Sequence, residues 1–312
     1  MNGSDPGGAS GPDSRDVPPP VAVPSPDPAG PAPGAPADPA VRTSRAGRDL
    51  PAAIAVGVGL GGLVLVSLFI VRDVFVLVVV GFALIGIREL SGALATGGTK
   101  VPVIPVGLGA VAMLVGGWIG GAELVLVALG VTLLGVLLVR LPAGAHGYVR
   151  DVTAGLFVLA YVPLLGAFVV LMAVPSDGAW RVVAFVVTTI SSDIGGYVVG
   201  VLAGRHLMTP TISPKKTWEG FAGSLGTCAV AGWLTVSYGL NGPAWVGVLL
   251  GVLTACAATI GDLSESLIKR DLGIKDMGSM LPGHGGMMDR LDSLLFVAPV
   301  AWVVLQMLVP VA

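Results

Sequence analysis

The sequence predicts an all-α, polytopic integral membrane protein with about nine transmembrane helices, preceded by a disordered N-terminal tail. Of the 312 residues, 54% are hydrophobic and only 12% are charged, whereas a soluble domain carries about 25% charged residues. The mean hydropathy is +0.88. From Leu50 onward, apolar runs long enough to cross a bilayer recur, and a spanning helix needs about 20 such residues. The net charge of −2 gives no sign of a nucleic-acid partner.

The tail comprises residues 1–49 and holds 12 of the 24 prolines, with many Gly, Ala, Ser and Asp residues. Such a segment cannot bury enough apolar surface to offset its ordering entropy, so we expect it to be disordered. It lacks the basic end, apolar middle and small-residue cleavage site of a signal peptide. Residues 50–312 are therefore expected to form one transmembrane domain.

The apolar runs divide this domain into nine expected spans, and each boundary is defined to within several residues. They cover about 51–71, 74–95, 101–119, 122–139, 152–174, 181–203, 218–238, 243–268 and 291–311. Only Arg72 and Asp73 separate the first two, which predicts a tight helical hairpin. Glycines such as Gly195-Gly196, and those in the stretch 57–62, are expected to let helices approach closely.

The basic residues predict the topology. Fifteen of the 17 lysines and arginines lie in, or closely adjoin, the tail or the even-numbered connections, and only Arg72 and Arg181 lie on the other side. Because positively charged loops stay in the cytoplasm, we expect a multi-pass protein of the cell membrane. Its N-terminus and its even loops would be cytoplasmic, and its C-terminus would lie outside.

Charged residues inside the apolar runs are the main functional signal, because each costs about 2.5–3.5 kcal/mol at membrane depth. Asp262, Glu265, Ser266 and Lys269 follow helical spacing, so they share one face of the eighth span. Glu265 and Lys269 have a simple explanation as an i,i+4 ion pair. Asp262 lies deeper and needs a cavity, a partner or an ion.

Asp289 and Asp292 open the ninth span and also share a face. The helix dipole favours negative charge at a helix N-terminus, which would explain one aspartate. Two carboxylates repel each other unless a cation lies between them, and hard oxygen ligands suit Mg²⁺. If the last two spans pack together, Asp262, Asp289 and Asp292 could bind one divalent ion. The pattern does not discriminate Mg²⁺ from Mn²⁺ and leaves room for a monovalent ion.

The connection between these spans has the composition of an anion site. Glycines flank His284 in the segment PGHGG, residues 282–286, and can turn backbone N–H groups toward an anion. Candidate substrate-binding residues here are Arg270, Lys275, His284, Gly285, Gly286 and Arg290. A lone histidine in a loop is usually structural, and no Walker A pattern is present.

Two further polar patches belong to the same predicted side. Asp193 interrupts the otherwise apolar sixth span, so it too requires a cavity or an ion. The sixth connection contains Ser213, Lys215, Lys216 and Glu219. Ser213 and Pro214 are typical of a helix start, and lysines suit phosphate groups. Helix capping and interfacial lysines are an equally good explanation of this patch. Together, the patches predict phosphoryl or nucleotidyl transfer.

The segments SLIKR (266–270), KD (275–276) and LPGHGGMMDRLD (281–292) resemble the signature of phosphatidate cytidylyltransferases, also called CDP-diacylglycerol synthases. ISPKKTWEG and SSDIGGY resemble other polar stretches of that family. The resemblance covers roughly residues 51–312 and leaves the tail outside.

This resemblance implies a reaction in which CTP and phosphatidate give CDP-diacylglycerol and pyrophosphate with Mg²⁺. It implies catalytic roles for Asp262, Asp289 and Lys269, a site at the cytoplasmic side of the lipid bilayer, and a homodimer.

Two alternatives remain at this point. Intramembrane carboxylates such as Asp193 and Asp262 also occur in ion-coupled transporters, although we see no inverted repeat of the kind that many transporters contain. A CTP-dependent polyprenol or lipid kinase would share the membrane helices and the basic loops. The two transferases differ in product, because a kinase releases CDP and a cytidylyltransferase releases pyrophosphate.

Overall fold

The computed structural model describes residues 50–278, 280 and 285–311. The tail predicted to be disordered therefore lies outside the described residues, as does His284. Within the described part, the α-helices are α1 (Leu50–Ile70), α2 (Arg72–Thr96), α3 (Val103–Val139), α4 (Tyr148–Leu159), α5 (Leu165–Ala173), α6 (Gly178–Ala203), α7 (Trp218–Leu234), α8 (Ala244–Asp271) and α9 (Met288–Leu308). A 3₁₀ turn, η1 (Leu141–Ala143), follows α3.

The all-α membrane class is confirmed. Six helical segments of the described residues are long and apolar enough to cross a bilayer. One of them, the segment containing α3, is interrupted at Gly120 and Gly121, where the backbone leaves helical geometry and Gly121 has a φ of +66°. The halves of α3 fold back on each other, because Gly109 packs against Thr132 and Gly116 against Leu124. The break falls at the predicted boundary between the third and fourth spans. The total of nine spans remains a prediction.

Two irregular turns keep predicted spans continuous. The π-turn η2 (Ala160–Leu164) joins α4 to α5 and contains Pro163, which cannot donate a helical hydrogen bond and crowds the preceding turn. The π-turn η3 (Thr235–Gly239) similarly extends α7. At the first predicted hairpin, α1 ends at Ile70 and α2 begins at Arg72.

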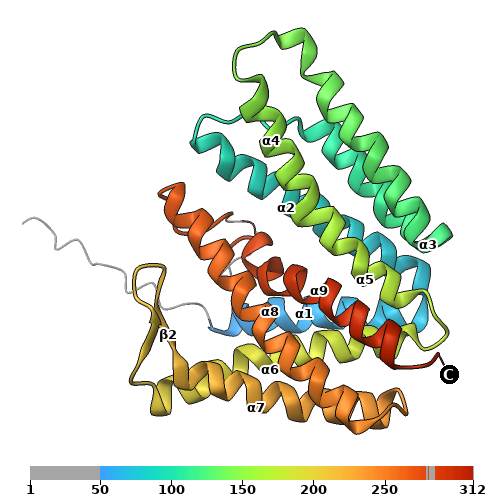
Figure 1. The fold of residues 1–312 in the computed structure, drawn as a ribbon, viewed down its shortest axis with the longest axis vertical. Helices are drawn as coiled ribbons and strands as arrows, with labels where there is room; N and C mark the ends of the chain where they lie inside the picture. Colours follow the sequence, from blue (N-terminus) through green and yellow to red (C-terminus); the bar gives the residue numbers. More distant parts are fainter. Residues whose placement is uncertain (1–49, 279, 281–284, 312) are drawn as a thin grey trace, which may run out of the picture. The chain divides into compact units, whose positions relative to one another are not determined.

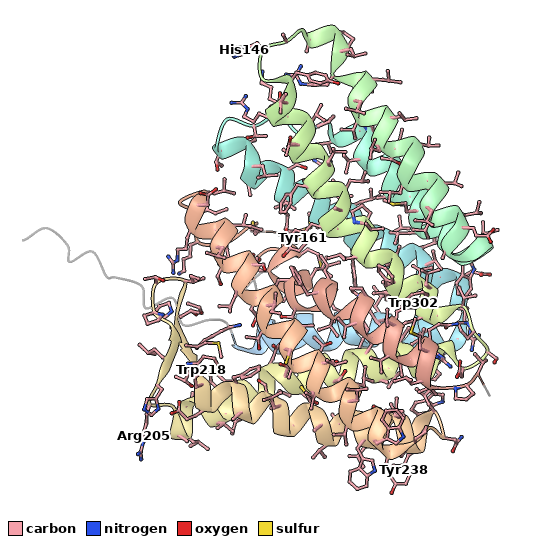
Figure 2. All side chains as sticks on the ribbon, viewed as in Figure 1. His146, Tyr161, Arg205, Trp218, Tyr238 and Trp302 are labelled. Carbon is pink, nitrogen blue, oxygen red and sulfur yellow. The ribbon has the colours of Figure 1, made fainter. Side chains whose placement is uncertain are left out.

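One expectation about local structure is wrong. Ser213 does not start a helix. It opens strand β2 (Ser213–Thr217), which pairs antiparallel with β1 (Leu207–Thr209). Thr217 is the N-cap of α7, because its side-chain oxygen accepts a hydrogen bond from the N–H of Gly220. Figure 2 labels Trp218 where the strand passes into α7.

Glycines bring α6, α7, α8 and α9 into backbone contact (Figure 1). Gly195 packs against Gly223 between α6 and α7, and Gly251 of α8 packs against the carbonyl of Cys228 in α7. A Cβ atom on Gly261 of α8 would lie 2.7 Å from the carbonyl oxygen of Asp292 in α9. The close packing expected at Gly195-Gly196 is confirmed, whereas the glycines of the stretch 57–62 face open space within 4 Å.

The two basic residues on the sparsely charged side have structural roles. Arg181 is 1% exposed, pairs with Asp177 at 2.7 Å and donates to the carbonyls of Leu305 and Val309 at 2.7 and 2.9 Å. It thereby satisfies backbone acceptors at the C-terminal end of α9. Arg72 donates to the carbonyl of Ser176 at 2.6 Å.

We predict that Arg181→Met lowers the free energy of unfolding by about 3–5 kcal/mol, because it leaves Asp177 buried without its charge partner. Arg72→Met is the matched control and should cost only about 1 kcal/mol, because Arg72 donates to neutral carbonyl groups near the surface. In a Cys256→Ser background, which removes the half-buried second thiol, thermal unfolding in detergent can be followed with a thiol-reactive dye that labels Cys228, which is buried in the native state. Equal destabilisation by the two substitutions would contradict this account.

Candidate functional site

A cavity of about 940 Å³ lies where α6, α8, α9 and β2 meet. Its lining is unusually charged for a protein built of apolar helices. We call it the acid–base cavity. Its acidic residues are Asp193, Asp262, Glu265, Asp276, Asp289 and Asp292, and its basic residues are Lys215, Lys216, Lys269, Lys275 and Arg290.

Asp262 joins three elements of the cavity. Its carboxylate pairs with the Nζ atom of Lys216 from β2 at 2.5 Å, and it accepts a short hydrogen bond from the hydroxyl of Ser293 in α9. The close approach of α8 and α9 at Gly261 brings Ser293 within reach. Asp262 therefore has the partner that its membrane depth requires.

Lys269 of α8 bridges α8 and α9 through two carboxylates, Glu265 and Asp289. Its Nζ atom lies 2.6 Å from Glu265 and 2.9 Å from Asp289. The ion pair expected between Glu265 and Lys269 is thus present. Asp289 also accepts hydrogen bonds from the backbone N–H groups of Gly286 at 2.9 Å and Met277 at 3.2 Å. Its carboxylate is consequently bonded to two separate points of the α8–α9 connection.

Glu265 is the buried centre of the acidic set, at 2% exposure. Its Oε1 atom has no hydrogen-bond partner among the described residues. Asp289 lies on the other side of their common partner Lys269, and Asp292 lines the same cavity. Carboxylates gathered in one space repel each other unless a proton or a cation lies between them.

The carboxylates of the acid–base cavity are the type of ligand that magnesium prefers. No group of three or more His, Cys, Asp or Glu side chains in the described part of the chain forms a ready metal site. Mg²⁺, however, usually takes one or two protein carboxylates and completes its shell with water and substrate phosphates. Glu265, whose Oε1 atom is unsatisfied, could supply such an oxygen ligand, and Asp262 and Asp292 line the same cavity.

Glu89 of α2 organises the connection from the opposite side. It accepts a hydrogen bond from the N–H of Met288, the first residue of α9, at 2.8 Å. Cβ atoms on Gly278 and Gly286 would collide with its carboxylate, so a larger residue at either position would displace Glu89. Sequence reasoning missed Glu89, because nothing in the sequence relates α2 to residues almost 200 positions later. Its only signal was a carboxylate near the end of an apolar run.

A smaller pocket of about 310 Å³ adjoins the acid–base cavity. The two share the wall formed by Asp193, Lys215, Lys216 and Asp262. Ser213 lines only this smaller pocket. The shared lysines can therefore face a ligand on either side.

The predicted site residues divide into two groups. The acid–base cavity brings together Asp193, Lys215, Lys216, Asp262, Lys269, Lys275, Gly285, Asp289, Arg290 and Asp292. Arg270 is exposed and lies off the cavity lining. Glu219 is directed elsewhere, because its carboxylate lies 2.5 Å from the Nδ1 atom of His206 and accepts from two backbone N–H groups. Gly286 acts through its N–H bond to Asp289.

Comparisons with known proteins identify the family of this chain. The model of the cytidylyltransferase family matches residues 51–308. The phosphatidate cytidylyltransferase of Mycobacterium bovis is 43% identical over 291 residues, which cover 89% of this chain and 95% of that relative. The enzyme of the same name from Mycobacterium leprae is 41% identical over 85% of this chain and 90% of its own length. That from Synechocystis is 44% identical over 39% of this chain and 41% of its own length. This chain therefore belongs to the cytidylyltransferase family.

Proposed function

We propose that this protein transfers the cytidylyl group of CTP to phosphatidate, forming CDP-diacylglycerol and pyrophosphate in phospholipid biosynthesis. The observation that carries the proposal is the acid–base cavity, where oxygen ligands for a metal and cations for phosphate groups line one space at the ends of apolar helices. Its relatives named phosphatidate cytidylyltransferase support the same reaction.

The location of the cavity suits one substrate from the bilayer and one from water. Positive charge keeps protein segments in the cytoplasm, and Lys215, Lys216 and Lys275 are on the cavity lining. We therefore place the cavity at the cytoplasmic side of the cell membrane, with the N-terminus inside and the C-terminus outside. A homodimer is compatible with this arrangement and would not be needed for the chemistry.

The ion pairs of the cavity can exchange partners when substrate binds. Lys216 now neutralises Asp262, and Lys269 neutralises Glu265 and Asp289. Phosphate oxygens would compete for these ammonium groups through charge-assisted hydrogen bonds. Each lysine transferred to a phosphate would leave a carboxylate without its counter-ion. Binding of the anionic substrate and of a cation would consequently favour each other.

The predicted metal ligands are Asp262, Asp289 and Asp292, and the geometry supports adding Glu265 to this set. Of these four, we propose Asp262, Glu265 and Asp292 as the direct ligands. Asp289 is left out because its carboxylate accepts from Lys269 and from two backbone N–H groups, whereas Asp262 and Glu265 would each have to release one lysine. Asp289 would then position Lys269 and the α8–α9 connection. When bound, Mg²⁺ would neutralise charge that develops on the phosphate oxygens.

The transfer itself is a direct displacement. An anionic phosphate oxygen of phosphatidate forms a bond to the α-phosphorus of CTP, and the bond from that phosphorus to the β-phosphate oxygen breaks. Pyrophosphate leaves with the bonding electrons. The attacking oxygen carries no proton near neutral pH, so the protein needs no general base. Lys216 and Lys269 stabilise the charge by holding phosphate oxygens.

The products distinguish this reaction from its alternatives. Purified protein given CTP, phosphatidate and Mg²⁺ should release pyrophosphate and form a cytidine-labelled lipid in equal amounts, and EDTA should stop both. Assays with dCTP and ATP in place of CTP measure the nucleotide preference. Release of CDP would indicate a lipid kinase instead, and absence of any lipid product would favour a transporter.

Substitutions at two aspartates separate metal binding from positioning. Asp292→Asn should raise the Mg²⁺ concentration needed for half-maximal activity by about tenfold or more, because it removes a charged ligand. Asp289→Asn should lower kcat about 100-fold at saturating Mg²⁺, because Lys269 loses its orienting charge. Its Mg²⁺ dependence should stay near that of the wild type. An Asp289→Asn variant with a strongly shifted Mg²⁺ requirement would instead make Asp289 a metal ligand.

The pair formed by Lys216 and Asp262 should behave as one unit. Lys216→Gln and Asp262→Asn should each reduce kcat/KM by at least about tenfold, since charged hydrogen bonds contribute about 1.5–3 kcal/mol. The double variant should lose much less than the product of the two effects, because each single change leaves the other charge unpaired. Multiplicative losses in a double-mutant cycle would show that the two side chains act independently.

A further inference from the structure

A second recess lies outside the acid–base cavity, between the C-terminal half of α2 and the start of α3. Its volume is about 530 Å³. Arg88 and Ser91 of α2, Lys100 of the connection and Val103 of α3 are on its lining. None of its lining residues belongs to the acid–base cavity or to the adjoining smaller pocket. The reaction proposed above therefore does not use it.

Ser91 is the first sign that a ligand binds here. The residue is 7% exposed, and its hydroxyl has no hydrogen-bond partner among the described residues. Serine and threonine inside a helix usually donate to the carbonyl four residues earlier, as Thr188 and Ser191 do in α6. Ser91 instead leaves a donor and an acceptor unused beside the recess, and a buried polar group without a partner is costly.

Two cations on the same lining indicate the charge of that ligand. Arg88 lies eight residues before the end of α2 at Thr96, about 12 Å along the helix axis. It is thus an arginine within an apolar span, where charged groups require a partner. Neither Arg88 nor Lys100 has a carboxylate partner among the described side chains. A guanidinium, an ammonium and a hydroxyl together match the oxygens of a phosphate group.

The surroundings favour a phosphate that belongs to a lipid. The recess borders Val103, and the first half of α3 continues from there with exposed Ile104, Leu108 and Val111. Their spacing places these three side chains on one helix face. Acyl chains could lie along this face while the headgroup occupies the recess. A soluble phosphate would make no use of it.

We propose that Arg88, Ser91 and Lys100 form a binding site for the phosphodiester headgroup of an anionic membrane phospholipid, separate from the substrate site. The chemistry needs one negative phosphate between the two cations, with the Ser91 hydroxyl as a hydrogen-bond partner. A zwitterionic headgroup carries an ammonium group that the two cations would repel, so it should bind more weakly.

Binding of phosphatidylglycerol and of phosphatidylcholine to the purified full chain tests this site, measured by native mass spectrometry or by titration in detergent. Arg88→Gln/Lys100→Gln should weaken phosphatidylglycerol binding about tenfold or more, since two charged hydrogen-bond donors are lost. Ser91→Ala should weaken it to a smaller degree. Arg205→Gln is the control for loss of one positive charge and is matched to Arg88→Gln alone. Arg205 lies in the exposed connection after α6 (Figure 2), so this control should leave binding unchanged.

Retention of wild-type phosphatidylglycerol affinity by the double variant would overturn the proposal, as would equal losses in the Arg205→Gln control. Inorganic phosphate at millimolar concentration should not displace the lipid, and displacement that depends on Arg88 would assign the recess to free phosphate instead. Turnover of CTP and phosphatidate should stay near the wild-type rate in these variants, which verifies that they are folded. Should the double variant misfold, Ser91→Ala and the charge-retaining Arg88→Lys still test the site, with loss expected in the first and near-normal binding in the second.

Discussion

The backbone contact between α8 and α9 at Gly261 is the constraint on which the acid–base cavity depends. A side chain at this position would collide with the carbonyl of Asp292. Without one, α9 lies close enough for the Ser293 hydroxyl to donate to Asp262. Small residues allow this approach in membrane helices, where packing replaces the hydrophobic effect as the force between them. Two helices separated by a polar connection thus place their carboxylates on the lining of one cavity.

Charges in this cavity are stable because they neutralise one another. Lys216 pairs with Asp262, and Lys269 pairs with Glu265 and Asp289. Breaking a buried pair by removing one member is costly, so the cavity is held together by the same groups that would handle substrate. Only the Glu265 Oε1 atom among these carboxylate oxygens is buried and unsatisfied in the described structure.

The sequence predicted the parts of this structure that follow local rules. Apolar runs revealed the helices, and the spacing of Asp262, Glu265 and Lys269 on one helical face correctly indicated a polar surface. The sequence pattern could not reveal the structural role of Glu89, because its contact with Met288 depends on how α2 packs against α9. The β1–β2 hairpin was missed for a related reason: the lysine-rich SPKKT segment has no alternating apolar pattern, and it is paired only with the short strand before it.

Individual contacts explain the two exceptions to the one-sided distribution of basic residues. Arg72 and Arg181 were the two exceptions on the sparsely charged side, and both donate to backbone carbonyls of neighbouring chain segments. Arg181 in addition has a buried carboxylate partner. These two side chains serve the fold and are not available to a ligand. The basic residues of the cavity, such as Lys216 and Lys269, belong to the side that the distribution of positive charge predicts to be cytoplasmic. A charged nucleotide would reach them there from water.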